Sequence, residues 1–458
     1  MLSALGLTYE IAAGRVLAPF FGTSLVTWTS VIATVLGGFS LGSALGGFVA
    51  ERPRAAALRA VRLSLVATAA LMAVSPILLG LVYGIGARGT GGMVFSVIVV
   101  FFPASVFVTI PSPLLAKLAI EARPGREGSS LGIVLAAGSV GAIFGAVLAG
   151  FVTLPAIGST ATFAACGAVA ILCLIFLRGG DDLPPGATLG AAGLVVLVGI
   201  AGPRVCAFES GLSCLHVIER GREVRLISDG TTQAAERRAL PGSAEELALP
   251  YVRWIWARMD RDLGDAPEVL FVGGGGYTLP TRLLESREAA RADVVEIDPL
   301  VTQVVRAHLP RAAETIAREG NGRLGIVHAD GRVHLNETTR RYDAAVMDAF
   351  SSSSVPAHLV TREAFARLRA LVDGPVYVNL IDETNGRLAR GVAAILREIW
   401  PEVIAVRGPV SGRGLRNVLF AASDRVLLPL DDLPPGYGPA RLSEGRAFTD
   451  DRGWIGHR

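Results

Sequence analysis

The sequence predicts a multi-span α-helical membrane domain followed by an α/β domain with a doubly wound parallel sheet. Of 458 residues, 51% are hydrophobic and only 18% are charged. The charge is uneven, because residues 1–203 hold 10 Lys+Arg and 6 Asp+Glu, which leaves 33 and 34 for residues 204–458. This composition excludes a disordered chain, a collagen-like fibre and a basic nucleic-acid-binding protein. The hydrophobic composition predicts that this protein has a lipid bilayer as a partner.

Apolar stretches in the first part approach or exceed the ~20 residues that a helix needs to cross a bilayer. They lie at about 1–21, 24–50, 63–87, 91–113, 129–154, 156–177 and 184–202. We therefore assign residues 1–203 to a membrane domain with about seven spans. Gly38, Gly42 and Gly46 recur at every fourth residue of the second stretch, which predicts close packing between helices.

Loop charges predict the orientation of these spans in the cell (inner) membrane. Eight Lys and Arg residues fall in loops on one side, against Arg88 on the other, so the first side and the N-terminus should be cytoplasmic. Seven crossings would place the following domain outside. If the short seventh stretch lies on the surface instead, that domain is cytoplasmic.

Two ionisable residues, Glu10 and Arg15, lie deep inside the first stretch. Such groups are costly in lipid and often mark a functional site. The alternative is that Arg15 extends to the membrane interface and that Glu10 pairs within the helix bundle.

Cys206 and Cys214 lie eight residues apart at the start of the second part. This spacing fits a small disulfide-closed loop in an oxidising compartment, and it equally fits two free thiols in the cytosol. No Cys or His cluster has the spacing of metal ligands, so we predict no metal site.

Residues 204–245 alternate as short strands, with a turn at Asp229-Gly230, and predict a small β unit. A helix is predicted at 246–259, and strands then alternate with helices as in a doubly wound domain that reaches residue 458. The expected elements lie at 268–272, 279–285, 293–297, 300–308, 324–328, 344–347, 362–371 and 376–380.

Ligands of such a sheet bind at the carboxyl ends of its strands. The first strand is followed by a run that allows close backbone approach to a nucleoside, Gly273, Gly274, Gly275 and Gly276. Glu296 ends the second strand, where a carboxylate can accept both ribose hydroxyls. Asp330 ends the third, where it could accept from an adenine amino group, and Asp348 ends the fourth. Each acid alone is readily a surface carboxylate, but three in succession beside the glycine run favour a ligand site.

A dinucleotide site is the natural competitor. The run reads GGGGYT and not GxGxxG, and an aspartate at the end of strand four has no task in hydride transfer. The pattern favours an S-adenosyl-type nucleoside.

These motifs resemble the polyamine aminopropyltransferases of the spermidine synthase type, and in particular their membrane-fused relatives, over nearly the whole chain. The run at 273–278 stands where that family has GGGDGG, residues 295–299 match its VEIDP, and residues 329–331 match its GDG. Asp348 matches its catalytic aspartate. The phrase DAFSSSSVPAHLVTREAF and Thr449-Asp450-Asp451 resemble the membrane-fused branch. The resemblance implies a Rossmann-like domain of the class I methyltransferase type.

The resemblance also implies roles by position. Glu296 would bind the ribose, Asp330 the adenine, and Asp348 the attacking amine as proton acceptor or orienting group, with Tyr251 as the active-site tyrosine. Other implied ligand-binding residues are Asp298 and Gly331 for the donor, and Gln233 and Ser351 for the acceptor. The implied donor is decarboxylated S-adenosylmethionine or S-adenosylmethionine, without a metal, and such a donor favours a cytoplasmic domain, against the loop charges.

Two departures from the family bear on the substrate. Gly276 stands where spermidine synthases have the acid that faces the donor ammonium, and Ser351 stands where they have a second diamine-binding aspartate. The loss of opposite charge removes a preference for the decarboxylated donor and disfavours putrescine.

The sequence thus predicts a membrane-anchored, spermidine synthase-like transferase that acts on a small-molecule amine or other nucleophile, with no nucleic-acid partner and with a homodimer left open. The alternatives are an S-adenosylmethionine-dependent methyltransferase and a non-catalytic nucleoside-binding or transport module.

Overall fold

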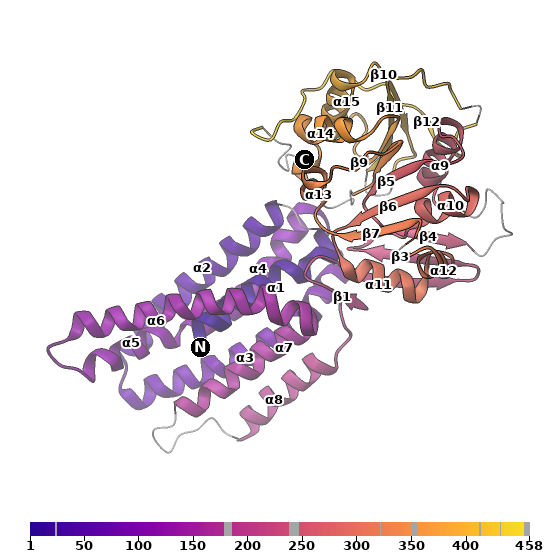
Figure 1. The fold of residues 1–458 in the computed structure, drawn as a ribbon. Helices are drawn as coiled ribbons and strands as arrows, with labels where there is room; N and C mark the ends of the chain where they lie inside the picture. Colours follow the sequence, from indigo (N-terminus) through magenta and orange to yellow (C-terminus); the bar gives the residue numbers. More distant parts are fainter. Residues whose placement is uncertain are drawn as a thin grey trace. The chain divides into compact units, whose positions relative to one another are not determined.

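The computed structural model describes residues 1–22, 25–177, 186–237, 247–320, 322–349, 355–411, 414–430 and 432–452. The chain divides into two compact units, Met1–Cys214 and Leu215–Arg458 (Figure 1). Each unit is described below by itself. The predicted domain boundaries at 203 and 245 stay predictions.

The first unit is built from helices. They are α1 (Leu2–Phe21), α2 (Leu25–Ala50), α3 (Arg54–Gly84), α4 (Gly89–Thr109), α5 (Pro111–Glu121), α6 (Glu127–Leu148), α7 (Leu154–Phe176) and α8 (Gly186–Ala201). Among the described residues, four helical segments are long and apolar enough to cross a membrane, Leu25–Ala50, Arg54–Gly84, Gly89–Glu121 and Glu127–Phe176. The seven crossings and the sidedness stay predictions.

The glycine stripe of α2 packs against α4 and the α4–α5 junction, as predicted. A Cβ atom at Gly38 would lie 2.6 Å from Cβ of Ser105, and one at Gly42 would lie 2.1 Å from the carbonyl oxygen of Val106. Any larger side chain would push the helices apart, so these glycines allow the close approach.

Arg15 of α1 is buried inside the first unit, and its predicted reach to a membrane interface stays a prediction. Its Nε donates to the carbonyl oxygen of Ser210 at 3.2 Å and lies 3.9 Å from Oε1 of Glu209 in β1 (Phe208–Glu209). The loop that carries Glu209 is closed by a disulfide between Cys206 and Cys214.

The second unit begins with the predicted small β unit. Strands β2 (Cys214–Arg220), β3 (Glu223–Ser228) and β4 (Thr231–Arg237) pair antiparallel in that order. Asp229 and Gly230 turn the chain between β3 and β4 with φ of 46° and 74°. This left-handed pair is what a tight hairpin requires.

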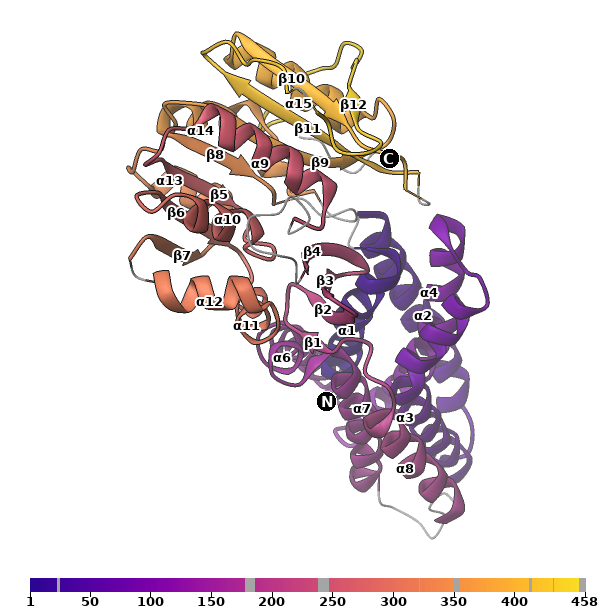
Figure 2. The ribbon, with the colours of Figure 1, turned by 90° about the vertical axis from the view of Figure 1, so that its right-hand side faces the viewer.

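The large sheet has the strand order β12-β10-β11-β9-β8-β5-β6-β7, which Figure 2 shows strand beside strand. Its parallel part consists of β5 (Glu268–Val272), β6 (Arg291–Glu296), β7 (Leu324–His328), β8 (Ala344–Met347) and β9 (Val376–Asp382). Strands β10 (Glu402–Arg407), β11 (Arg416–Ser423) and β12 (Gly438–Pro439) join antiparallel. The predicted doubly wound sheet is confirmed, and it has the Rossmann-like, methyltransferase-type order.

Helices cover both faces of this sheet. They are α9 (Pro250–Asp262), α10 (Thr278–Ser286), α11 (Pro299–His308), α12 (Pro310–Glu319), α13 (Gly331–Glu337), α14 (Arg362–Leu371) and α15 (Arg387–Ile399). The core on one face joins side chains of α13, α14 and α15 to the strands, while α9 and α10 pack on β11 and β6. Strand order reverses between β5 and β8, and in open α/β sheets this switch point is where ligands bind.

Candidate active site

Four of the predicted site segments lie at the carboxyl ends of neighbouring parallel strands. The glycine run follows β5, Glu296 ends β6, Asp330 follows β7, and Asp348 follows β8. The parallel pairing brings these ends to one edge of the sheet, around the switch point.

The glycine run brings β5 close to the end of β8. Gly273 has φ of 103°, and a Cβ atom there would lie 2.4 Å from the backbone oxygen of Asp348. Gly275 has φ of 50°. The conformation at Gly273 therefore requires glycine for two reasons, its left-handed backbone and its contact with the neighbouring strand.

Glu296 is buried, with 7% of its surface exposed, and backbone N–H groups hold its carboxylate. Its Oε2 accepts from Gly274 at 2.9 Å and from Gly275 at 3.3 Å, and its Oε1 accepts from Asp298 at 3.0 Å. Burial raises the pKa of Glu296, and these three hydrogen bonds oppose the rise. Since a carboxylate oxygen has two lone pairs, Oε1 keeps acceptor capacity for a hydroxyl group. This fits the predicted ribose contact.

Asp298 and Asp330 act as N-caps of the helices that follow them. Asp298 accepts from the backbone of Leu300 at 3.0 Å and is 2% exposed, so it stabilises α11. Oδ1 of Asp330 accepts from the backbone of Arg332 at 2.8 Å and caps α13. The other oxygen of Asp330 lies 2.9 Å from Nε2 of His358.

The pKa of Asp330 lies below its usual value. Desolvation alone would raise it, but the backbone N–H of Val333, the His358 ring and the backbone N–H of Arg332 together lower it. Gly331 begins α13, and a Cβ atom there would lie 2.7 Å from Cγ1 of Val272. Asp330 is thus an ionised acceptor at the strand end, and His358 is a neighbour that the sequence did not indicate.

Gly276 is packed against the small β unit. A Cβ atom at this position would lie 2.0 Å from Cβ of Ala234 in β4. Tyr277, the next residue, has a left-handed backbone with φ of 56°, and its hydroxyl lies 2.7 Å from that of Thr302. An acidic side chain at 276 therefore has no room in this arrangement.

Asp348 is held by side chains from two other elements. Its Oδ1 accepts from Nδ2 of Asn379 in β9 at 2.7 Å, and its Oδ2 accepts from the hydroxyl of Tyr251 in α9 at 3.3 Å. Burial raises the pKa of Asp348 to about 7, although both hydrogen bonds act to lower it. A carboxylate with this pKa can both hold and release a proton near neutral pH.

Tyr251 is the hydrogen-bond donor in this contact. Burial and the negative charge of Asp348 raise the pKa of Tyr251 well above its usual value, and Tyr437 adds to the rise. The Tyr251 hydroxyl also lies 3.4 Å from the backbone oxygen of Gln233, which brings β4 to the site. Ser351, the other predicted acceptor residue, lies outside the described residues.

Asn379 and Asn417 complete the support of Asp348. Nδ2 of Asn417 in β11 donates to Oδ1 of Asn379 at 2.9 Å, which orients the Asn379 amide so that its NH₂ group faces Asp348. Asn379 is 3% exposed. Sequence reasoning missed both residues, although a lone amide inside the apolar strand VYVNLI was a usable signal, since buried polar groups need partners.

Ile297 is a further residue that the sequence reasoning did not single out. It directly follows Glu296 and is 50% exposed, in contrast to the buried apolar residues of β6. An apolar side chain beside a ribose-binding acid can pack on the face of a base.

The C-terminal segment that carries Asp450 binds beside this edge. Oδ1 of Asp450 accepts from the hydroxyl of Thr361 at 2.7 Å, and Oδ2 accepts from Arg332 at 2.7 Å. The Asp450 N–H donates to Glu363 at 3.0 Å. Motifs that are distant in the sequence, near 361–363 and 449–451, therefore lie together.

These features define the class of the second unit, a domain of the Rossmann-like methyltransferase type with a buried carboxylate beside its glycine loop. Residues 260–381 match the family described as spermine/spermidine synthase domain. The second unit is thus similar to spermine/spermidine synthase domains over these residues, and the predicted resemblance is confirmed. Among the described residues, no group of three His, Cys, Asp or Glu side chains is placed to hold a metal ion.

Several known proteins are similar to this chain. A polyamine aminopropyltransferase of Vibrio vulnificus is 30% identical over 162 residues, which cover 34% of this chain and 51% of that protein. Polyamine aminopropyltransferase 2 of Streptomyces coelicolor is 26% identical over 480 residues, 99% of this chain and 82% of that protein. A probable spermidine synthase of Corynebacterium glutamicum has a solved structure with a TM-score of 0.45 and 18% identity, over 54% of this chain and 97% of that one. The chain thus spans only about half the length of the Vibrio relative.

Proposed function

We propose that this protein is a membrane-anchored transferase of the spermidine synthase type, which moves an aminopropyl group from an S-adenosyl sulfonium donor to an amine. The observation that carries the proposal is the placement of Asp348, a carboxylate with a pKa of about 7, at the strand end beside the glycine run and Glu296. The names of the relatives, polyamine aminopropyltransferases, support the same reaction class.

In this reaction the amine nitrogen attacks the carbon bound to the sulfonium, a C–N bond forms, and the C–S bond breaks to release 5′-methylthioadenosine. The amine loses one proton, and Asp348 is the acceptor. Tyr251 and Asn379 keep the Asp348 carboxylate in one orientation, so that catalysis rests on positioning and on general-base assistance. Glu296 and Asp330 hold the ribose and the adenine of the donor.

The acceptor in this proposal is an amine other than plain putrescine. Asp348 is contacted by an amide and a phenol, which are neutral groups, and residues 349–354 read AFSSSS, without an ionisable side chain. A diamine carries a second ammonium group, and a second carboxylate would be needed to bind it well.

The donor is decarboxylated S-adenosylmethionine, which carries the aminopropyl group, or S-adenosylmethionine, from which the same attack would transfer a 3-amino-3-carboxypropyl group. Selectivity for the first would need an acid near its ammonium group, and position 276 has neither an acid nor the space for one. The two donors should therefore bind with similar affinity.

The test uses the full chain in detergent with each donor and a panel of amines, following 5′-methylthioadenosine and S-adenosylhomocysteine. We expect 5′-methylthioadenosine with a monoamine acceptor, and its loss in Asp348→Asn. Efficient and donor-selective spermidine formation from putrescine would overturn the acceptor and donor assignments. S-adenosylhomocysteine as the product would replace aminopropyl transfer with methyl transfer.

Membrane anchoring through the helical unit is part of this proposal, and the Cys206–Cys214 disulfide suits an oxidising compartment. Thiol labelling of intact and permeabilised cells tests the side of the membrane. Both cysteines should resist labelling until a reductant is added. Labelling after permeabilisation alone would place them in the cytosol.

A further inference from the structure

Among the described residues of the helical unit, Glu10 and Glu209 have largely buried carboxylates, and these differ in their hydrogen-bond and ion-pair partners. Glu209 accepts from the backbone N–H of Ser159 at 2.9 Å and has Arg15 nearby. Glu10 is 9% exposed, and its buried Oε2 accepts no hydrogen bond from the described residues. An ionised carboxylate in an apolar interior costs several kcal/mol unless a cation meets it. Glu10 is therefore a buried carboxylate of this unit to which the described residues supply no cation.

Aromatic side chains of α2 lie one helical turn to either side of Glu10. Gly6, Glu10 and Gly14 follow each other at every fourth residue of α1 and so share one face of the helix. A Cβ atom at Gly6 would lie 2.8 Å from the ring of Phe39, and one at Gly14 would lie 2.4 Å from the ring of Trp28. A carboxylate between two aromatic residues is the chemistry that binds an ammonium group, through charge and through cation–π attraction.

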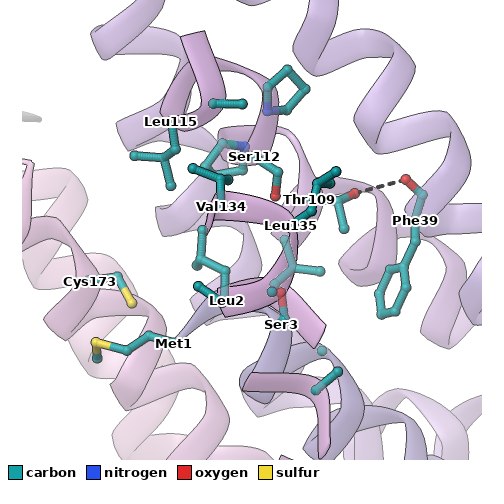
Figure 3. Close-up of a pocket in the computed structure, with 18 of the residues that line it drawn as sticks. Met1, Leu2, Ser3, Phe39, Thr109, Ser112, Leu115, Val134, Leu135 and Cys173 are labelled. Carbon is teal, nitrogen blue, oxygen red and sulfur yellow. Dashed lines mark hydrogen bonds between the residues drawn. The ribbon is translucent and has the colours of Figure 1, made fainter. Parts of the chain in front are cut away.

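A cavity of about 870 Å³ reaches the same face of α1 (Figure 3). Gly6 and Phe39 belong to its lining, one turn from Glu10, and Figure 3 shows Phe39 beside Thr109, whose hydroxyl donates to the Phe39 carbonyl oxygen at 3.2 Å. Apolar side chains of α1, α5 and α6, such as Leu2, Leu115 and Leu135, form much of the wall. A cavity with such walls suits a hydrocarbon chain.

We propose that the helical unit binds an alkylammonium ion, with its ammonium group at Glu10 between Phe39 and Trp28 and its hydrocarbon chain in the adjoining cavity. The site is independent of the proposed transfer reaction, because every residue in it belongs to the first unit. The competing explanation is a protonated, neutral Glu10 that binds nothing.

The experiment is calorimetric titration of the full chain in phosphatidylcholine nanodiscs with n-hexylammonium, corrected with empty nanodiscs. n-Hexanol is the neutral control ligand. Glu51→Gln is the matched control variant, because Glu51 is an exposed glutamate of the same unit. We expect saturable binding of n-hexylammonium to the wild type and to Glu51→Gln, at least tenfold weaker binding to Glu10→Gln, and no difference among the three proteins for n-hexanol.

Trp28→Leu keeps the proposal testable if Glu10→Gln does not fold. Loss of one cation–π contact of about 0.5–2 kcal/mol should weaken n-hexylammonium binding about two- to thirtyfold while Glu10 is retained. Equal affinity of wild type and Glu10→Gln, equal affinity of wild type and Trp28→Leu, or no binding to the wild type would each overturn the site.

Discussion

The proposed donor and acceptor sides at the carboxyl ends of the strands, so called for the roles proposed above, are built in different ways. On the donor side, Glu296 and Asp330 are held by backbone N–H groups that lie close in sequence or directly follow a neighbouring strand. On the acceptor side, Asp348 is held by the side chains of Tyr251 and Asn379, which lie 97 and 31 residues away in the sequence. The donor side is therefore a property of the fold, while the acceptor side depends on individual side chains.

This difference indicates that specificity for the acceptor can change more readily than specificity for the donor. Backbone N–H groups are present whatever the sequence, so the donor side tolerates substitution as long as its glycines and acids remain. The acceptor side can change its substrate by one or two substitutions without disturbing the sheet. The two described hydrogen-bond partners of Asp348, an amide and a phenol, are neutral groups, which is consistent with such a change.

The largest expected effect is the loss of turnover when Asp348, on the acceptor side, is replaced. Asp348→Asn removes the proton acceptor but keeps the shape and the contact with Tyr251, so turnover should fall about 10²–10⁴-fold, the usual range for a general base. The affinity for 5′-methylthioadenosine should stay within about twofold, as calorimetry would measure. Asp343→Asn, at the opposite end of the same strand, is the control. Equal activity of Asp348→Asn and the wild type would remove Asp348 from the reaction.

On the donor side, by contrast, substitution should weaken the binding of 5′-methylthioadenosine. Glu296→Ala removes charge-assisted bonds to the ribose, together worth about 2–4 kcal/mol, so 5′-methylthioadenosine should bind at least tenfold more weakly. Asp298→Ala is the matched comparison, because this side chain caps α11. Asp298→Ala should lower the free energy of unfolding by about 1 kcal/mol, with little change in the affinity for 5′-methylthioadenosine. If Asp298→Ala weakens binding as much as Glu296→Ala, Asp298 is a ligand-binding residue as the sequence predicted.

The contact between Gly276 and Ala234 joins the small β unit to the donor side. Gly276→Ala should destabilise the protein by about 1–3 kcal/mol, as overpacking usually does, because the new Cβ atom would meet that of Ala234. Combining it with Ala234→Gly should recover most of the loss in a thermal unfolding assay. No recovery in the double variant would mean that the backbone at 276, and not this contact, requires glycine.

The placement of the proposed donor-side residues could be predicted from the sequence. The glycine run, Glu296 and Asp330 each follow a strand whose apolar pattern is plain, and the parallel sheet brings strand ends together. Much of the acceptor side could not be predicted. Asn417 and Asn379 meet only because β11 inserts antiparallel beside β9, although α15 and β10 separate these two strands in the sequence. The N-capping role of Asp298 could not be predicted either, because a carboxylate before a proline can cap a helix or bind a ligand, and the sequence does not distinguish the two roles.

The smallest expected effect concerns Asn379, and it tests whether the side-chain support of Asp348 matters for its proton. The Asn379 hydrogen bond lowers the pKa of Asp348, so its removal in Asn379→Ala should raise that pKa further above about 7. Loss of one hydrogen bond to a charged group, about 1.4 kcal/mol, corresponds to about one pKa unit. The ionised fraction of Asp348 at pH 7 would then fall about fivefold, while at pH 9 both proteins would be mostly ionised. The pH dependence of the rate of Asn379→Ala should therefore move toward higher pH, with most of the activity recovered at pH 9 and the affinity for 5′-methylthioadenosine unchanged.

The control is Asn336→Ala, on the exposed face of α13, which should leave the pH dependence of the rate unchanged. A uniform loss of rate at every pH would mean that Asn379 positions the substrate and has no influence on the Asp348 proton.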